Sequence, residues 1–156
     1  MIKAHVLVEG QTEETFIRTV LGPYLAVRGI YLTPVLVATK RIKFGKDFGT
    51  HRLLPYLSLH EFEALLLADP AEIGTSLSGQ TSRLEEEVSG FRSPEEIDEG
   101  PETHPAARIV RLLPGYRKAV HGPLAAARIG LKSMRQRCPH FDNWVTRLER
   151  LSSPTP

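Results

Sequence analysis

The sequence predicts a single α/β domain, because apolar, strand-like runs alternate with amphipathic helical segments from the first residues onward. Residues 2–8 form an apolar run, Glu9 and Gly10 open a turn, and residues 13–27 follow with helical periodicity. The 156 residues are 41% hydrophobic and 24% charged, which is typical of one globular domain. We therefore expect a domain over residues 1–151, followed by a disordered tail at 152–156.

The helix expected over residues 13–27 has one apolar stripe, because its hydrophobic residues recur at spacings of one, three and four. Thr12 is the expected N-cap, and Glu13 and Glu14 lie in the first turn, where the helix dipole favours acids. We interpret these two acids as helix-stabilising and Gly29 as the end of the helix.

The remaining elements follow from the same periodicities. Glu85, Glu86 and Glu87 lie in a helical stretch and are interpreted as a solvated face, whereas residues 91–105 are rich in Pro, Gly, Ser and acids and predict a loop. The other expected elements are strands over 31–37 and 53–59 and helices over about 61–68, 106–113, 124–137 and 142–151, the last burying Trp144, Val145, Leu148 and Leu151.

Composition excludes several classes of protein. No apolar run approaches the roughly 18 residues of a membrane span, and the N-terminus lacks the pattern of a secretory signal. Cys138 is the single cysteine, so neither an internal disulfide nor a cysteine-based zinc site is expected. No Gly-x-x-x-x-Gly-Lys loop occurs, which argues against ATP hydrolysis by this chain. We expect a cytoplasmic protein without membrane association.

The net charge of +2 conceals a strong segregation along the chain. The balance of Lys and Arg against Asp and Glu is +4 over residues 1–60, −10 over 61–102 and +8 over 103–156. A basic C-terminal third suits a surface that follows phosphates, because neutralising phosphates releases counterions. The other interpretation is that the acidic and basic thirds pair with each other in the fold.

The turn after the first strand is the first candidate site. Ligands of open α/β sheets bind at the carboxyl ends of strands, where Glu9 is expected. Gly10 permits a close backbone approach, and the helix start near Thr12 offers unpaired N–H groups to a phosphate. A carboxylate there suits metal-assisted chemistry on a phosphate, but Glu-Gly at a strand end is also a common simple turn.

The second candidate is the motif His60-Glu61-Phe62-Glu63. It is not the His-Glu-x-x-His zinc motif, because Ala64 stands where the second histidine would be. If the strand at 53–59 neighbours the first strand, Glu61 or His60 reaches Glu9, and the two carboxylates share one divalent ion. Alternatively, the acids stabilise the first helical turn and His60 is a capping or core residue. Among the three we favour Glu61 as the functional residue.

A basic loop follows the second strand. Lys40, Arg41 and Lys43, with Phe44 beside them, are suited to grip a phosphate backbone and stack a base. The other interpretation is a solvated connection.

Six motifs spread along the chain resemble a bacterial family of unknown function, domain-of-unknown-function family 4276, which is classed as Toprim-like. They are Leu7-Val8-Glu9-Gly10-Gln11-Thr12-Glu13-Glu14, Pro55-Tyr56-Leu57-Ser58-Leu59-His60-Glu61-Phe62-Glu63-Ala64-Leu65-Leu66, Ser93-Pro94-Glu95-Glu96-Ile97, Gly100-Pro101-Glu102-Thr103, His121-Gly122-Pro123-Leu124 and Cys138-Pro139-His140-Phe141. The resemblance implies a Toprim-like α/β fold, with a central, mostly parallel sheet flanked by helices and a helical C-terminal portion. In that fold an acid after the first strand, matched here by Glu9, works with an Asp-x-Asp pair around Mg²⁺.

The chain departs from that pattern in one respect. Relatives carry a further segment before the Pro-Tyr strand, with a strand that ends in an aspartate, whereas this sequence contains no Asp-x-Asp. The chain is therefore either a natural short form or a form from which a stretch between about residues 38 and 52 is missing.

The resemblance and the two candidate sites together predict a nuclease, a phosphodiester hydrolase that uses Mg²⁺ or Mn²⁺ and acts on DNA or RNA. Proteins of this kind resemble effectors of phage-defence systems, which implies an SMC/ABC-type ATPase partner and self-association into a homo-oligomer. The alternative is a non-catalytic binding or assembly subunit without the Asp-x-Asp pair. The residues expected in the site are Glu9, Glu61 and His60 as catalytic groups, Glu9 and Glu61 as metal ligands, and Gly10, Thr12, Lys40, Arg41 and Lys43 as phosphate-binding residues.

Overall fold

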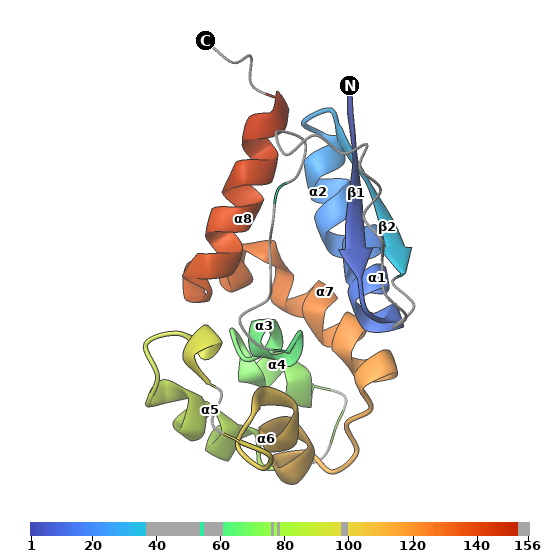
Figure 1. Cartoon of the computed structure of the whole chain (residues 1–156). Coiled ribbons are helices and arrows are strands. Elements are labelled where there is room, and N and C mark those ends of the chain that lie inside the picture. Colours follow the sequence, from blue (N-terminus) through green and yellow to red (C-terminus); the bar gives the residue numbers. More distant parts are fainter. Residues whose placement is uncertain (37–53, 55–60, 76, 78, 98–99, 153–156) are drawn as a thin grey trace.

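The chain begins with a β–α–β unit (Figure 1). The computed structural model describes residues 1–36, 54, 61–75, 77, 79–97 and 100–152. Strands β1 (Ile2–Val8) and β2 (Ile30–Leu36) pair in parallel, with Ile2 opposite Ile30. The α/β class is thereby confirmed as a small, two-stranded parallel sheet with many helices among the described residues. The expected third strand at 53–59 lies almost entirely outside those residues.

The helix between the two strands is continuous but changes its winding. It consists of α1 (Gln11–Phe16), a π-helical segment (Ile17–Leu21) and α2 (Gly22–Ala26). The Gly22 N–H donates to the Ile17 carbonyl, five residues earlier. Pro23 follows directly and has no N–H to donate within the helix. Its ring would also clash with the carbonyl four residues earlier in a regular α-helix, and the wider π turn avoids this clash. The sequence pattern missed this change.

The start of this helix also differs from expectation. Gly10, rather than Thr12, is the N-cap residue, and Thr12 lies inside the first turn and is buried. The helix begins at Gln11, so the acids of the first turn keep the place expected for them.

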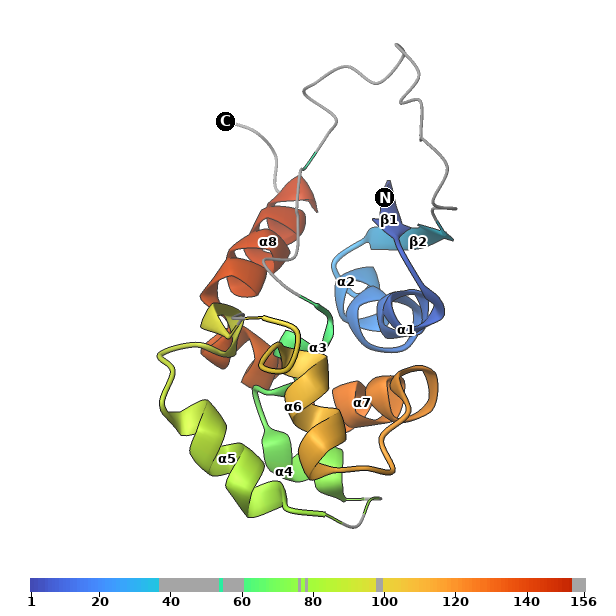
Figure 2. The same ribbon diagram turned by 60° about the horizontal axis from the view of Figure 1, so that its bottom comes forward.

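The rest of the described chain is helical. Its longest helix, α7 (Lys118–Arg137), packs against α1 on one side and against α3 and α4 on the other, with α8 at its far end (Figures 1 and 2). The other helices are α3 (Glu63–Leu66), α4 (Pro70–Gly74), α5 (Thr81–Ser89), α6 (Pro105–Leu112) and α8 (Pro139–Glu149).

The helices expected over 106–113, 124–137 and 142–151 are confirmed as α6, α7 and α8, with shifted ends. α7 starts six residues earlier than expected, because Pro123 lies inside it rather than before it. The expected helix at 61–68 is shorter, and α4 follows it after a turn that ends at Pro70.

A glycine breaks α7 into two parts. Gly130 has φ 69° and ψ 161°, a conformation that L side chains rarely adopt. The second part of α7 can therefore turn away from the first and pack beside α8.

One hydrophobic core joins the β–α–β unit to the helical part. Phe16 of the first helix packs edge-on against Phe62, with ring centroids 5.4 Å apart, and lies 6.1 Å from Phe141 of α8. Trp144, Val145 and Leu148 are buried as expected, and Leu151 is partly buried. Within the ranges that the structure describes, no helix is both long and apolar enough to cross a membrane.

Two acidic segments are more closely packed than the sequence suggested, although Glu85 and Glu86 are exposed as expected. Glu87 of the acidic stretch accepts hydrogen bonds from Arg108 at 3.2 Å and Arg111 at 2.7 Å, both on α6. The segment 91–105 contains a 3-10 turn (Pro94–Glu96) whose Glu95 is buried. Apart from this turn and the start of α6 at Pro105, the described residues of 91–105 form a loop, as expected, and the pairing of Glu95 with groups far along the chain was not anticipated.

Candidate functional site

Glu9 stands exposed at the carboxyl end of β1, directly before the helix start. Gly10 then serves as the N-cap, and its missing side chain leaves room for Glu13, since a Cβ on Gly10 would lie 2.9 Å from Glu13 Oε2. The Glu13 carboxylate is thus folded back over the turn that carries Glu9.

The other carboxylate oxygen of Glu13 faces a lysine from α7. Lys118 Nζ lies 3.7 Å from Glu13 Oε1 and 3.0 Å from Oε2 of Glu63 on α3. The Lys118 side chain is 46% exposed, whereas the Glu63 side chain is completely buried. Lys118 therefore joins the turn after β1 to a buried acid.

Glu63 is held from its second oxygen by a tyrosine. The Tyr116 hydroxyl donates to Glu63 Oε1 at 3.2 Å. Burial, the charge of Glu63 and this hydrogen bond raise the pKa of Tyr116 far above its usual value, so the hydroxyl stays protonated. Oε2 has the ammonium of Lys118 close by, but no well-directed hydrogen bond from the residues described. We call Glu13, Glu63, Tyr116 and Lys118 the Glu63 cluster.

The charge of Lys118 is secured by its surroundings. Burial lowers the pKa of its ammonium, but the close contact with Glu63 and the charges of Glu63 and Glu13 raise the pKa by more. Lys118 is therefore fully protonated near neutral pH.

Close packing fixes the cluster between three helices. A Cβ on Gly122 of α7 would lie 3.0 Å from Thr12 Cγ2 and 3.2 Å from the Tyr116 hydroxyl oxygen. Thr12, expected to bind phosphate, thus presents its methyl group to α7 and is buried.

Glu61 caps the N-terminus of α6. Its Oε2 accepts a hydrogen bond at 3.1 Å from the Ala106 N–H in the first turn of α6, and lies 2.7 Å from Nδ1 of His104, the N-cap residue of that helix. Because a carboxylate only accepts, Nδ1 carries the proton. Burial raises the pKa of Glu61, but the hydrogen bonds from His104 and Ala106 lower it by more, so the pKa lies below its usual value.

A second long-range cap joins two of the sequence motifs. Glu95 of the Ser-Pro-Glu-Glu-Ile motif accepts the N–H groups of His140 at 2.8 Å and Phe141 at 2.9 Å, at the start of α8. The two motifs therefore fix one helix start.

Arg135 is the centre of an ion-pair network in the described chain. It contacts Glu149 with both terminal nitrogens, at 3.0 and 3.1 Å, and donates to the Tyr24 hydroxyl at 2.7 Å. The acidic and basic thirds pair with each other at other places, through Glu87 with Arg108 and Arg111 and through Glu63 with Lys118. Part of the C-terminal positive charge is thus engaged inside the fold.

The predicted site residues are only partly described. Glu9 and Gly10 lie on the turn after β1, Thr12 is buried in the first turn of α1, and Glu61 is engaged at the start of α6. His60, Lys40, Arg41 and Lys43 lie outside the described residues. Within the described part of the chain, no three His, Cys, Asp or Glu side chains are arranged to hold one metal ion.

Sequence reasoning missed Lys118, Tyr116 and Glu63 as one unit. A usable signal was present, because Glu63 interrupts the apolar run Phe62 to Leu67, and an acid inside a buried run requires a partner. The partner itself lies 55 residues away and leaves no local pattern.

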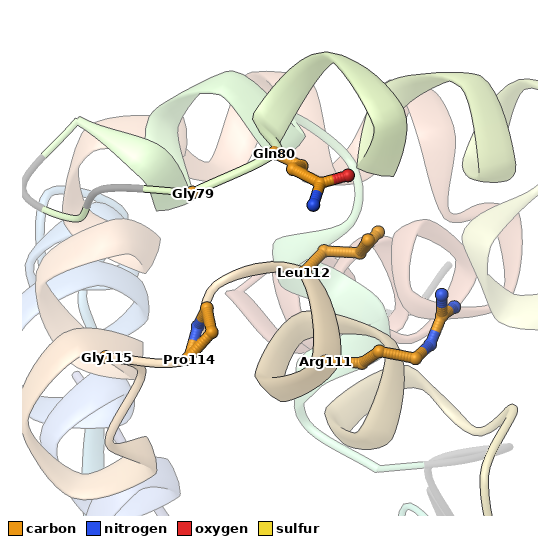
Figure 3. A pocket seen from close by; sticks show the side chains of 6 residues that line it. All are labelled: Gly79, Gln80, Arg111, Leu112, Pro114 and Gly115. Carbon is orange, nitrogen blue, oxygen red and sulfur yellow. The ribbon is translucent and has the colours of Figure 1, made fainter.

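A surface pocket of about 360 Å³ lies elsewhere, between the connection before α5 and the end of α6 (Figure 3). It is lined by Gly79, Gln80, Arg111, Leu112, Pro114 and Gly115. None of these residues belongs to the Glu63 cluster or to the predicted site.

Comparison with known proteins gives one match. Residues 41–149, more than two thirds of the chain, match the sequence model of a family described as a domain of unknown function (DUF4276). The match begins after the turn that carries Glu9 and includes α3, α7 and Glu61. No curated protein and no solved structure matches the chain.

Proposed function

We propose that this protein is a phosphodiester hydrolase that acts on DNA or RNA with Mg²⁺ or Mn²⁺. The premise is that the chain belongs to the family described as a domain of unknown function (DUF4276). The observation that carries the proposal is the turn after β1. There an exposed carboxylate, Glu9, follows the strand, and the ammonium of Lys118 is held beside the same turn through Glu13. A carboxylate and a fixed cation suit a phosphate ester.

The described residues fit a largely hydrated ion rather than a closed protein cage. Mg²⁺ is commonly held by one or two carboxylates, waters and substrate phosphate oxygens, and the exposed Glu9 can supply one such carboxylate. When bound, Mg²⁺ or Mn²⁺ would neutralise phosphate charge and lower the pKa of a bound water.

Each predicted site residue would have a role at the metal ion or the phosphate. Glu9 would hold the ion or accept a proton, and the backbone around Gly10 and Thr12 would approach the phosphate. Glu61, whose Oε2 is already engaged at the start of α6, would add Oε1 to the metal shell, and His60 would act with it as a catalytic group. Lys40, Arg41 and Lys43 would contact the nucleic-acid backbone.

The Toprim-like assignment, the place in phage defence, the SMC/ABC-type ATPase partner and the homo-oligomer rest on the motif resemblance. With them, the proposal is that the protein is a Toprim-like, self-associating effector of phage defence that acts with an SMC/ABC-type ATPase.

A second function is favoured by one observation. Glu61 and Glu95 both act as long-range helix caps, so two motif acids serve the shell of the fold. Structural roles of this kind need no catalysis, as expected of a non-catalytic binding or assembly subunit.

A cleavage assay separates the two functions. Fluorescently labelled single- and double-stranded DNA and RNA are incubated with the protein in Mg²⁺, Mn²⁺ or EDTA. The hydrolase reading expects cleavage only with the metal, and a loss of about 100-fold or more in Glu9→Gln. Glu14→Gln is the matched control, because Glu14 lies nearby in the first turn of α1 but pairs with Arg18 at the surface. No metal-dependent cleavage of any substrate would favour the binding subunit, and equal rates for wild type and Glu9→Gln would refute the role of Glu9.

A further inference from the structure

The Glu63 cluster contains a charged group that stability alone does not explain. Glu63 has no exposed surface and is flanked by Phe62, Ala64 and Leu65, which are buried apolar residues. Replacing a buried ion pair by apolar residues of similar volume is often neutral or stabilising. The acid therefore gives the site something that an apolar residue would not.

What it gives is a fixed position for the Lys118 ammonium. A lysine side chain at a surface is normally free to move through many rotamers, which costs entropy when it is ordered on binding. Here Nζ is held 3.0 Å from a carboxylate that cannot itself move, because Glu63 is enclosed and Tyr116 donates to its other oxygen.

The side chain of Lys118 is also partly open to solvent. The Lys118 side chain remains 46% exposed, and its second acidic neighbour, Glu13, is 3.7 Å away and 26% exposed. Such a loose, solvent-exposed contact contributes little, so an incoming anion can replace it. Glu13 also lies over Gly10, which places the ammonium beside the turn that carries Glu9.

We propose that Lys118 is a substrate-binding residue that contacts a phosphate group of a nucleic-acid strand, and that Glu63 and Tyr116 are positioning residues that hold it. The inference deepens the proposed function by assigning a phosphate contact to the same site. Lysine binds phosphate as a point charge, and a preordered ammonium avoids the usual loss of side-chain entropy.

The test measures binding without cleavage. Fluorescence anisotropy of a labelled single-stranded DNA oligonucleotide is recorded in EDTA over a series of salt concentrations. Lys118→Met is expected to weaken binding about tenfold and to reduce the slope of log Kd against log salt by about one phosphate contact. Lys118→Arg should restore most of the affinity. Lys132→Met, an exposed lysine on the second part of α7, is the matched control and should change Kd less than about twofold.

A second variant guards against loss of folding. Lys118→Met leaves the Glu63 charge buried without its cation, so the double variant Lys118→Met/Glu63→Gln removes both charges with little change in volume. The double variant should fold and bind as weakly as Lys118→Met. A folded Lys118 variant with wild-type affinity and an unchanged salt slope would overturn the proposal, as would a wild-type protein that shows no salt-dependent binding.

The outcomes distinguish this inference from the proposed reaction. If wild type never cleaves but Lys118→Met still weakens binding, the phosphate contact stands and the hydrolase proposal fails. If wild type cleaves and Lys118→Met binds normally, the role of Lys118 fails alone.

Discussion

The cap that Glu95 places on α8 gives the sharpest prediction about stability. Its two carboxylate oxygens accept the N–H groups of His140 and Phe141, at 2.8 and 2.9 Å, and its side chain is buried. These two donors belong to the first turn of α8, whose N–H groups have no partner within the helix. Glu95→Ala removes the acceptor of these two hydrogen bonds and opens a small cavity.

The expected loss combines two effects. An N-cap substitution by alanine costs about 0.5 to 2 kcal/mol. Hydrogen bonds to a charged group contribute about 1.5 to 3 kcal/mol each, but the two bonds share one carboxylate and do not add fully. We therefore expect Glu95→Ala to lower the free energy of unfolding by about 3 kcal/mol. For a domain of this size that corresponds to a fall in Tm of about 6 to 12 °C.

Urea unfolding followed by circular dichroism measures this loss directly. Glu96→Ala is the matched control, because Glu96 is the next residue in the same 3-10 turn but is exposed. The control should stay within about 0.5 kcal/mol of wild type. If Glu95→Ala proves no less stable than Glu96→Ala, the cap does not stabilise α8 and the reasoning is refuted.

Three further predictions follow from charge, burial and backbone conformation. The hydrogen bond from Arg135 lowers the pKa of Glu149, so the ionised Glu149 stabilises the fold above the usual carboxyl pKa of about 4.3, and this stabilisation is lost as the pH falls through the lowered pKa. In acid unfolding curves, Glu149→Gln should remove this part of the stability loss. Parallel curves for wild type and Glu149→Gln would contradict the prediction. Burial raises the pKa of the Cys138 thiol to about 12. At about pH 8, Ellman's reagent should therefore label Cys138 only as fast as the protein opens. Immediate labelling would contradict the burial of this thiol. Gly130→Ala, at φ 69°, should cost about 1 to 2 kcal/mol in urea unfolding, whereas Gly90→Ala, at φ −71°, should be neutral or slightly stabilising; equal effects would disprove the kink in α7.

Local patterns were sufficient for the elements that a single periodicity specifies. The strand Ile2–Val8 was expected from its apolar run, and the buried stripe of Trp144, Val145 and Leu148 was expected from helical periodicity. Gly29, with φ 74°, ends the region of the first helix as the sequence indicated.

Local patterns failed where a charged side chain meets a distant backbone or an opposite charge. Glu61 was predicted as a metal ligand, and its hydrogen bond to the first turn of α6, 45 residues away, was not anticipated. Glu87 looked solvated and is paired with Arg108 and Arg111. Neither contact leaves a periodic pattern or a fixed spacing in the sequence, because each contact depends on which helices become neighbours in the fold. The Glu63 cluster was missed for the same reason.

The chemistry proposed for the turn after β1 can be tested most directly with a small phosphodiester. Hydrolysis of bis(p-nitrophenyl) phosphate in Mn²⁺ requires neither a particular nucleic-acid sequence nor a partner protein. The account predicts metal-dependent release of p-nitrophenol by wild type and a rate about 100-fold or more lower in Glu9→Gln. A wild-type rate equal to that of Glu9→Gln, or to that of Mn²⁺ without protein, would contradict it.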